Sequence, residues 1–218
     1  MGLRLGCAGP KALVEVDGSP LLLRTMRQFA AIAAGSDIIV PVPAACREAF
    51  AVALSAVGAP VHVRLVDGGE QRQDSVWNAL EALNPDTELV LIHDAARPFV
   101  PMEVIEAAAD AAREYGAATV AVPVVDTILE VDSEGFLENT PDRNRLWACQ
   151  TPQAFRVEVI REAHRQARAR HFYATDDAAL VRLMGKPVKI VEGVPHNFKV
   201  TTPFDLIMAA QMVREDMG

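Results

Sequence analysis

Short apolar segments rich in β-branched residues alternate along this chain with longer segments whose apolar residues recur every three or four positions. The first pattern is typical of buried strands and the second of amphipathic helices. Strands are predicted over Asp37–Val42, Val61–Val66, Glu88–Ile92, Ala118–Val122 and Val188–Val191. Helices are predicted over about Pro20–Ala34, Ala44–Val57, Arg72–Leu83, Pro101–Tyr115, Val157–Arg168, Asp176–Met184 and Pro203–Arg214. This alternation implies right-handed crossovers, so we expect a doubly wound α/β fold with a mostly parallel sheet.

One stretch departs from this alternation. Thr127–Val131 and Phe136–Glu138 read as two short strands around the turn Asp132–Gly135, with no helix between them. One interpretation of this inserted β-hairpin is a surface flap. The other is an arm that contacts a partner subunit, because an isolated hairpin is only marginally stable unless it packs on something.

Composition and charge narrow the classes of function. The chain has 218 residues, enough for one domain over 1–218 with a sizeable core. Its net charge of −8 argues against nonspecific binding to nucleic acid, which depends on Lys and Arg. No apolar run reaches about 18 residues, so we expect no membrane span. The cysteines Cys7, Cys46 and Cys149 are too widely spaced to indicate a metal site or disulfides, which favours the reducing cytoplasm.

The segment "HDAARPF", His93–Phe99, follows a predicted buried strand directly. Ligands of open α/β sheets bind beyond the carboxyl ends of the strands, which places this segment at the expected site. Asp94 offers the hard oxygen ligand that Mg²⁺ prefers together with substrate phosphates. The alternative is that Asp94 caps a turn and Arg97 pairs with it, while His93 anchors the end of the strand.

Near the amino terminus, "GLRLGCAGPK" combines glycines with two cations. Gly2, Gly6 and Gly9 permit close approach of backbone to an anion, and Arg4 and Lys11 supply positive charge. The spacing matches neither the P-loop nor the dinucleotide-binding motif. The pattern alone therefore indicates an anion site only weakly.

A third segment, "DGGEQRQDSV", follows a predicted strand and opens a predicted helix. Its glycines Gly68 and Gly69 would let backbone groups face a flat base, and Ser75 would read a base edge. Alternatively, Asp74 and Ser75 satisfy the exposed amides of a helix start. Four further segments, each more typical of scaffold when taken alone, are "PVVDT" at 123–127, "DRNRLWACQTPQ" at 142–153, "ATDD" at 174–177 and "NFKVT" at 197–201.

Taken in order, these segments resemble the 2-C-methyl-D-erythritol 4-phosphate cytidylyltransferases of the non-mevalonate isoprenoid pathway, from Gly2 to about Ala210. The resemblance implies a Rossmann-like nucleotidyltransferase domain with a hairpin arm at about residues 126–150. It also implies transfer of a cytidylyl group from CTP to methylerythritol phosphate, with release of pyrophosphate and Mg²⁺ as cofactor.

The resemblance further assigns residues to roles. Asp94 matches the magnesium ligand, and Arg4 and Lys11 match cations that steady the charge developing at the α-phosphate. Gly2 falls in the nucleotide-binding loop, Gly68, Gly69 and Ser75 fall in the cytosine-recognising segment, and Ala95 lies close to the ribose. Matches to residues that hold the acceptor's phosphate and hydroxyls, or lie beside them, are Arg97, Asp126, Thr127, Arg143, Thr151, Thr175 and Lys199. Arg143 and Lys199 are expected to act in catalysis with Arg4 and Lys11.

In the family the arm crosses to a second subunit, so the resemblance implies a homodimer in which Thr127 and Arg143 act in the partner's site. Family members also carry an upstream apolar strand and a "PAAG"-like segment before the residue that matches Gly2. These are absent from this sequence. We therefore expect that the natural protein starts further upstream, or that this chain is a shortened and impaired version.

Two other functions stay open on the sequence. A cytidylyltransferase for another polyol phosphate, such as ribitol 5-phosphate, would share the scaffold and a similar motif at the end of a strand. A non-catalytic nucleotide-binding relative would keep the fold without the reaction. A Rossmann oxidoreductase is a more distant alternative because the dinucleotide signature is absent.

Overall fold

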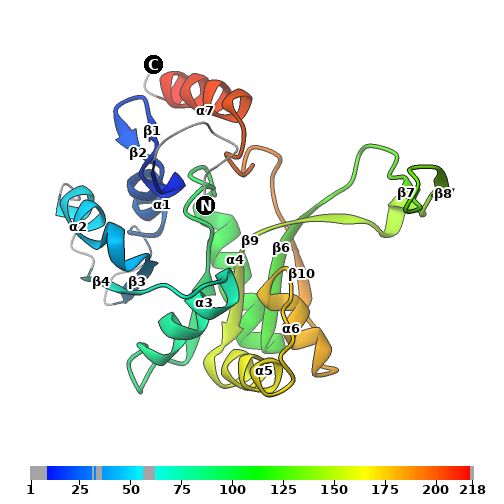
Figure 1. Cartoon of the computed structure of the whole chain (residues 1–218), viewed down its shortest axis with the longest axis horizontal. Coiled ribbons are helices and arrows are strands. Elements are labelled where there is room, and N and C mark those ends of the chain that lie inside the picture. Colours follow the sequence, from blue (N-terminus) through cyan, green and yellow to red (C-terminus); the bar gives the residue numbers. More distant parts are fainter. Residues whose placement is uncertain (1–8, 31, 33–35, 56–61, 217–218) are drawn as a thin grey trace.

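The centre of the protein is a four-stranded sheet in the order β10–β6–β9–β5 (Figure 1). The structure is a computed structural model that describes residues 9–30, 32, 36–55 and 62–216. The strands are β5 (Leu89–Ile92), β6 (Ala117–Pro123), β9 (Trp147–Arg156) and β10 (Lys189–Glu192). β10 runs parallel to β6, and β9 runs antiparallel to both β6 and β5. Three of the four strands therefore share one direction, as the predicted α/β fold requires.

A second, two-stranded parallel sheet joins β3 (Asp37–Val42) and β4 (His62–Asp67). All five predicted strands are confirmed, with ends that agree to within about a residue. A short antiparallel pair, β1 (Glu15–Val16) and β2 (Ser19–Pro20), precedes the first helix. Pro20, predicted to begin that helix, instead ends β2.

The strand β9 was not predicted. Its sequence contains Pro152 between polar residues, and a proline normally argues against a central strand because it cannot donate a backbone hydrogen bond. Here the pairing register with β6 shifts between Thr119, opposite Gln153, and Ala121, opposite Cys149. The bulge contains Pro152, so the missing N–H falls where the ladder is already interrupted.

Seven α-helices surround the sheets in the described part of the chain (Figure 1). They are α1 (Leu21–Ala30), α2 (Arg47–Ser55), α3 (Arg72–Glu81), α4 (Met102–Tyr115), α5 (Val157–Ala169), α6 (Asp177–Leu183) and α7 (Pro203–Asp216). Each corresponds to a predicted helix. α4 ends at Gly116, whose left-handed φ of 86° allows the αL cap that glycine favours. None of the described helices is both long and apolar enough to cross a membrane.

Helices cover both faces of the central sheet. Successive side chains of a strand point to opposite faces, and both Ala154 and Phe155 of β9 are fully buried. Ala154 packs in a core with Ile105 of α4, whereas Phe155 packs in another core with Ile160 of α5. The sheet is therefore the middle layer between two helical layers.

The predicted hairpin extends from this body as an arm (Figure 1). Its strands are β7 (Glu130–Val131) and β8 (Leu137–Asn139), which pair antiparallel. β7 is shorter than the predicted Thr127–Val131, and β8 is shifted by one residue from the predicted Phe136–Glu138. Asp132 closes the turn, because its carboxylate accepts hydrogen bonds from the backbone N–H groups of Glu134 and Phe136.

Candidate active site at the carboxyl end of the sheet

Asp94 follows the carboxyl end of β5 and is surrounded by cations. Its Oδ2 lies 2.6 Å from Lys199 Nζ, and its Oδ1 lies 3.7 Å from Arg72 Nε. The Asp94 side chain is 19% exposed and that of Lys199 is 42% exposed, so the pair lies at a partly open surface. A carboxylate and a lysine from distant parts of the chain thus meet at one point.

The ionisation of Asp94 follows from these neighbours. Burial raises the pKa of the Asp94 carboxyl, but the charge and hydrogen bond of Lys199, then the charges of Arg72 and Arg97, outweigh burial. The pKa of Asp94 is therefore lowered from its usual value, and Asp94 is an ionised carboxylate at neutral pH, able to bind a cation through its oxygens.

The backbone around Asp94 is held by Thr151 and His93. The N–H of Asp94 donates to Thr151 Oγ1 (3.1 Å), which also lies 3.0 Å from His93 Nδ1. His93 Nε2 lies 3.0 Å from the carbonyl oxygen of Arg97, which can only accept, so Nε2 carries the proton. Nδ1 then accepts the Thr151 hydroxyl. His93 therefore anchors the end of the strand, as predicted.

The environment of His93 excludes it as a proton carrier. Burial lowers the pKa of His93 to about 4, because the imidazolium would be desolvated. The ring is neutral at pH 7 and both its nitrogens are engaged within the fold.

Arg97 cross-links three segments of the site. Its guanidinium donates to the carbonyl oxygens of Asn197 (2.7 Å) and Cys149 (3.1 Å) rather than pairing directly with Asp94. Burial lowers the pKa of Arg97, which nevertheless stays far above neutral as for any arginine. Its predicted contact with the acceptor stays a prediction.

The segment that carries Lys199 is fixed by a buried polar network that the sequence reading missed. Asn197 is fully buried, and its Nδ2 donates to Gln150 Oε1 (3.1 Å) and to the Thr151 carbonyl (2.9 Å). Gln150 Nε2 donates in turn to the Val194 carbonyl (2.9 Å). These bonds tie the loop after β10 to β9, and so place Lys199 beside Asp94.

The loop between β4 and α3 is closed by its own side chains. The N–H of Gly69 donates to Ser75 Oγ (3.0 Å), and that hydroxyl lies 3.1 Å from the Gln71 carbonyl that accepts it. Asp74 accepts the N–H of Gln71, which completes a capping box. The helix-start interpretation of Asp74 and Ser75 is thus confirmed. Recognition of cytosine by Gly68, Gly69 and Ser75 stays a prediction.

The structure places the predicted residues in two groups. The first group lies around the end of β5 and the facing part of β9: Asp94, Ala95, Arg97, Thr151 and Lys199. Thr25 of α1 adds a hydrogen bond to the Ala95 carbonyl (2.9 Å). Thr175 precedes α6, whose N-cap Asp176 lies 3.4 Å from Cys149 Sγ. Lys11 begins a short 3₁₀ helix (Lys11–Leu13).

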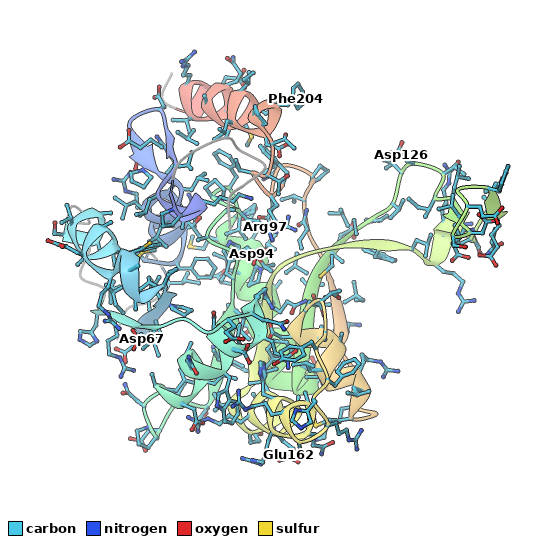
Figure 2. The ribbon with its side chains drawn as sticks, viewed as in Figure 1. Asp67, Asp94, Arg97, Asp126, Glu162 and Phe204 are labelled. Carbon is cyan, nitrogen blue, oxygen red and sulfur yellow. The ribbon has the colours of Figure 1, made fainter. Side chains whose placement is uncertain are left out.

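The second group belongs to the arm. Asp126 lies at its base, well apart from Asp94 of the same chain (Figure 2). Arg143 opens a 3₁₀ helix (Arg143–Arg145) and donates to the Val125 carbonyl (3.0 Å). Asp126, Thr127 and Arg143 thus sit on an element directed away from the body. Gly2 and Arg4, the remaining predicted residues, lie outside the described residues.

These features define an α/β protein with a charged ligand site beyond the carboxyl end of a strand, where such sheets bind ligands. An aspartate–lysine pair at that end, linked through Arg72 to a glycine-containing loop that opens a helix, is the arrangement expected of the α/β nucleotidyltransferase that the sequence resemblance implies.

Comparison with known proteins makes the class more specific. The family model described as 2-C-methyl-D-erythritol 4-phosphate cytidylyltransferase matches residues 1–215. The enzyme of that name from Pelotomaculum thermopropionicum is 43% identical over 218 residues, covering 100% of this chain and 92% of the relative. The corresponding protein of Geobacillus thermodenitrificans is 45% identical over 208 residues, covering 95% and 90%.

Solved structures agree with this assignment. The crystal structure of 2-C-methyl-D-erythritol 4-phosphate cytidylyltransferase from Thermus thermophilus superposes with a TM-score of 0.80 at 36% identity, covering 95% of each chain. The 4-diphosphocytidyl-2C-methyl-D-erythritol synthase of Anaerococcus prevotii gives a TM-score of 0.85 at 30% identity, covering 95% of this chain and 94% of that one. The chain belongs to the 2-C-methyl-D-erythritol 4-phosphate cytidylyltransferase family, and it is an enzyme that transfers a cytidylyl group from CTP to methylerythritol phosphate.

Proposed function

We propose that this transfer takes place at Asp94 and Lys199, beyond the carboxyl end of β5. The observation that carries the proposal is the 2.6 Å contact between these two side chains, whose backbone segments are held in place by hydrogen bonds. The reaction joins two anions, which repel strongly in a partly dry site. A site that concentrates fixed positive charge beside a carboxylate meets that requirement.

Mg²⁺ fits this site as an ion that the enzyme and the nucleotide bind together. In the part of the chain that the structure describes, no group of three His, Cys, Asp or Glu side chains could hold a metal ion alone. Mg²⁺ commonly binds through one or two carboxylates plus substrate phosphates, and Asp94 supplies one ionised, partly exposed carboxylate. When bound, the ion would neutralise charge on the triphosphate.

The chain's own residues then act by position and charge. The acceptor phosphate is already ionised at neutral pH, so an oxygen of that phosphate attacks the α-phosphorus of CTP without a general base. A new bond forms from this oxygen to the α-phosphorus, and the bond from the α-phosphorus to pyrophosphate breaks. Lys199, with Lys11 and Arg4 as the family resemblance assigns them, stabilises the charge that develops.

The arm supports a homodimer as the working form. Its apolar side chains are exposed, with Val125 at 81%, Phe136 at 67% and Leu137 at 61%. Such exposure on a thin hairpin is costly unless a partner covers it. A partner subunit would receive the arm, which would bring Thr127 and Arg143 to the partner's Asp94.

The cytoplasm is the compartment we propose, because Cys46 and Cys149 are free thiols.

Replacing the carboxylate tests the site. Asp94→Asn keeps the shape of the side chain but removes the negative charge, and we expect turnover to fall on the order of 10²-fold. Pyrophosphate release with CTP, methylerythritol phosphate and Mg²⁺ is the measurement. Asp110→Asn, which changes an exposed aspartate paired with Arg113 on α4, is the control and should keep its rate.

The same assay separates the other functions. Turnover with ribitol 5-phosphate and none with methylerythritol phosphate would point to the other acceptor. Absence of pyrophosphate release with every acceptor would favour a non-catalytic nucleotide-binding protein. An active Asp94→Asn variant would remove Asp94 from its proposed role.

A further inference from the structure

Arg72, the first residue of α3, lies between two carboxylates that come from different parts of the chain. Its Nη1 is 2.7 Å from Asp177 Oδ2 of α6, and its Nε is 3.7 Å from Asp94 Oδ1. The exposed fraction of the side chain falls from 39% for Arg72 to 19% for Asp94 and 1% for Asp177. One guanidinium therefore connects the acid of the active site with a buried acid beneath it.

The buried end of this chain of contacts is fixed. Asp177 Oδ1 lies 3.0 Å from Nε2 of His164, which is fully buried, so the two carboxylate oxygens have different partners. The N–H of Asp177 donates to Gln153 Oε1 of β9 (3.1 Å). Burial raises the pKa of Asp177, but the hydrogen bond of His164 and the charge of Arg72 lower it further. An ionised, buried carboxylate cannot turn away from these partners without a large desolvation cost.

The exposed end has two cations with different freedom. Lys199 Nζ contacts Asp94 Oδ2 directly, and its flexible, 42% exposed side chain is able to turn to a substrate phosphate. The guanidinium of Arg72 is planar and is held by Asp177, so it stays beside Asp94 Oδ1 when the Lys199 side chain turns away. The Arg72–Asp94 distance is that of an ion pair rather than a hydrogen bond, which leaves Oδ1 free to bind a metal.

We propose that Arg72 is a positioning residue for the cytidylyl transfer: anchored by Asp177 and His164, it holds the Asp94 carboxylate in the orientation that receives the metal–nucleotide complex. This inference rests on the proposed role of Asp94. Neighbours of ligating groups commonly change metal affinity or activity by about 10- to 100-fold when removed.

Metal binding without turnover tests the role of Arg72. We expect Arg72→Gln to weaken Mn²⁺ binding to the enzyme–CTP complex at least about 10-fold, measured by water-proton relaxation in the absence of acceptor. In the full assay the half-saturating Mg²⁺ concentration should rise and kcat should fall. The KM for methylerythritol phosphate should change less than about threefold, because Arg72 acts on the metal side of the site.

Arg168→Gln is a matched control. Arg168 Nη1 lies 3.7 Å from Asp74 Oδ1, the same separation as Arg72 from Asp94, and Asp74 is 22% exposed. Arg168 and Asp74 take no part in the Asp94–Lys199 contact, and surface ion pairs contribute little free energy. The affinity of Arg168→Gln for Mn²⁺ should therefore be within about twofold of that of the unmodified protein.

Two further variants make the result decisive. Arg72→Lys keeps the charge and is expected to stay folded by circular dichroism, but an ammonium cannot span both carboxylates, so Mn²⁺ binding should fall at least about threefold. Unchanged Mn²⁺ binding in either folded Arg72 variant would overturn the inference. Mn²⁺ binding to Asp94→Asn is measured in parallel. If Asp94→Asn weakens Mn²⁺ binding and the Arg72 variants do not, only the role of Arg72 is refuted. If Asp94→Asn binds Mn²⁺ normally, the proposed role of Asp94 as a metal ligand is refuted.

Discussion

Gly193 lies where the backbone after β10 passes against the polar network of the site. A Cβ at this position would come within 2.4 Å of Gln150 Oε1 and 2.6 Å of Val120 Cγ1. Separations below 3.0 Å essentially do not occur for real Cβ atoms, so a side chain here must displace Gln150. Gln150 is the acceptor for buried Asn197, and the loop that carries Lys199 depends on that bond.

We therefore expect Gly193→Ala to lower the free energy of unfolding by about 1–3 kcal/mol, as overpacking of a filled site does. Turnover should fall as well, because the displaced Gln150 releases Asn197 and, with it, the position of Lys199. Urea unfolding and pyrophosphate release measure the two effects. An unfolding free energy within about 0.5 kcal/mol of the unmodified protein would show that the loop accommodates a methyl group without moving Gln150.

For single residues, the sequence predicts which side chains carry chemistry better than it predicts which side chains contact one another. Asp94 was identified because a carboxylate after a buried strand is a local pattern. Arg72, Asp177 and Asn197 were not assigned roles, since each acts through a partner far away in the chain. Only the fold brings such partners together, and no spacing within a single segment reveals them.

Among the elements, α7 shows how a local signal contributes to the site. Thr202 and Asp205 form reciprocal bonds: Asp205 Oδ2 accepts the Thr202 N–H (2.7 Å), and the Asp205 N–H donates to Thr202 Oγ1 (3.2 Å). The same carboxylate accepts the N–H of Thr201 (2.7 Å). The cap residue Thr202 lies three residues after Lys199, and the N–H of Val200 donates to the Ala96 carbonyl (2.8 Å). The start of the helix therefore helps fix Lys199.

We expect Asp205→Asn to reduce the unfolding free energy at pH 7 by about 1 kcal/mol, the usual contribution of a helix cap. Burial raises the pKa of Asp205, but hydrogen bonds from Thr201 and Thr202 lower it below the unfolded value. The stabilisation is therefore present above the unfolded pKa and is lost as the pH falls through the folded pKa. Urea unfolding at several pH values should show the two proteins converging in acid. A constant difference down to acid pH would contradict the role of the charge.

The elements also show where sequence patterns fail. The β-branched strands and the amphipathic helices were predicted because their periodicity is local and strong. β9 was missed because its polar residues and Pro152 have the composition of a loop. Its strand character comes from the pairing of Ala154 and Phe155 with β5 and β6, and from the burial of both side chains. Tertiary packing decides such a segment.

For the whole molecule, the arm raises the question of which site its residues serve. Asp126 lies well apart from Asp94 of the same chain (Figure 2). A twofold homodimer would exchange arms, so each site would combine Asp94 and Lys199 of one subunit with Thr127 and Arg143 of the other. The apolar residues Phe136 and Leu137 at the tip would be covered by the same exchange. Assembly and catalysis would then depend on one another.

Mixing two inactive variants tests this exchange. Arg143→Ala keeps Asp94, and Asp94→Asn keeps Arg143, so each homodimer should be inactive. After joint unfolding and refolding, about half of the dimers should be mixed, and one of the two sites in each mixed dimer should have both residues. Pyrophosphate release should therefore recover to about a quarter of the unmodified rate. As a control, each variant refolded alone should stay inactive. If Arg143 acts on its own subunit's site, every site in the mixture lacks one residue, and the rate would stay at that of the separate variants.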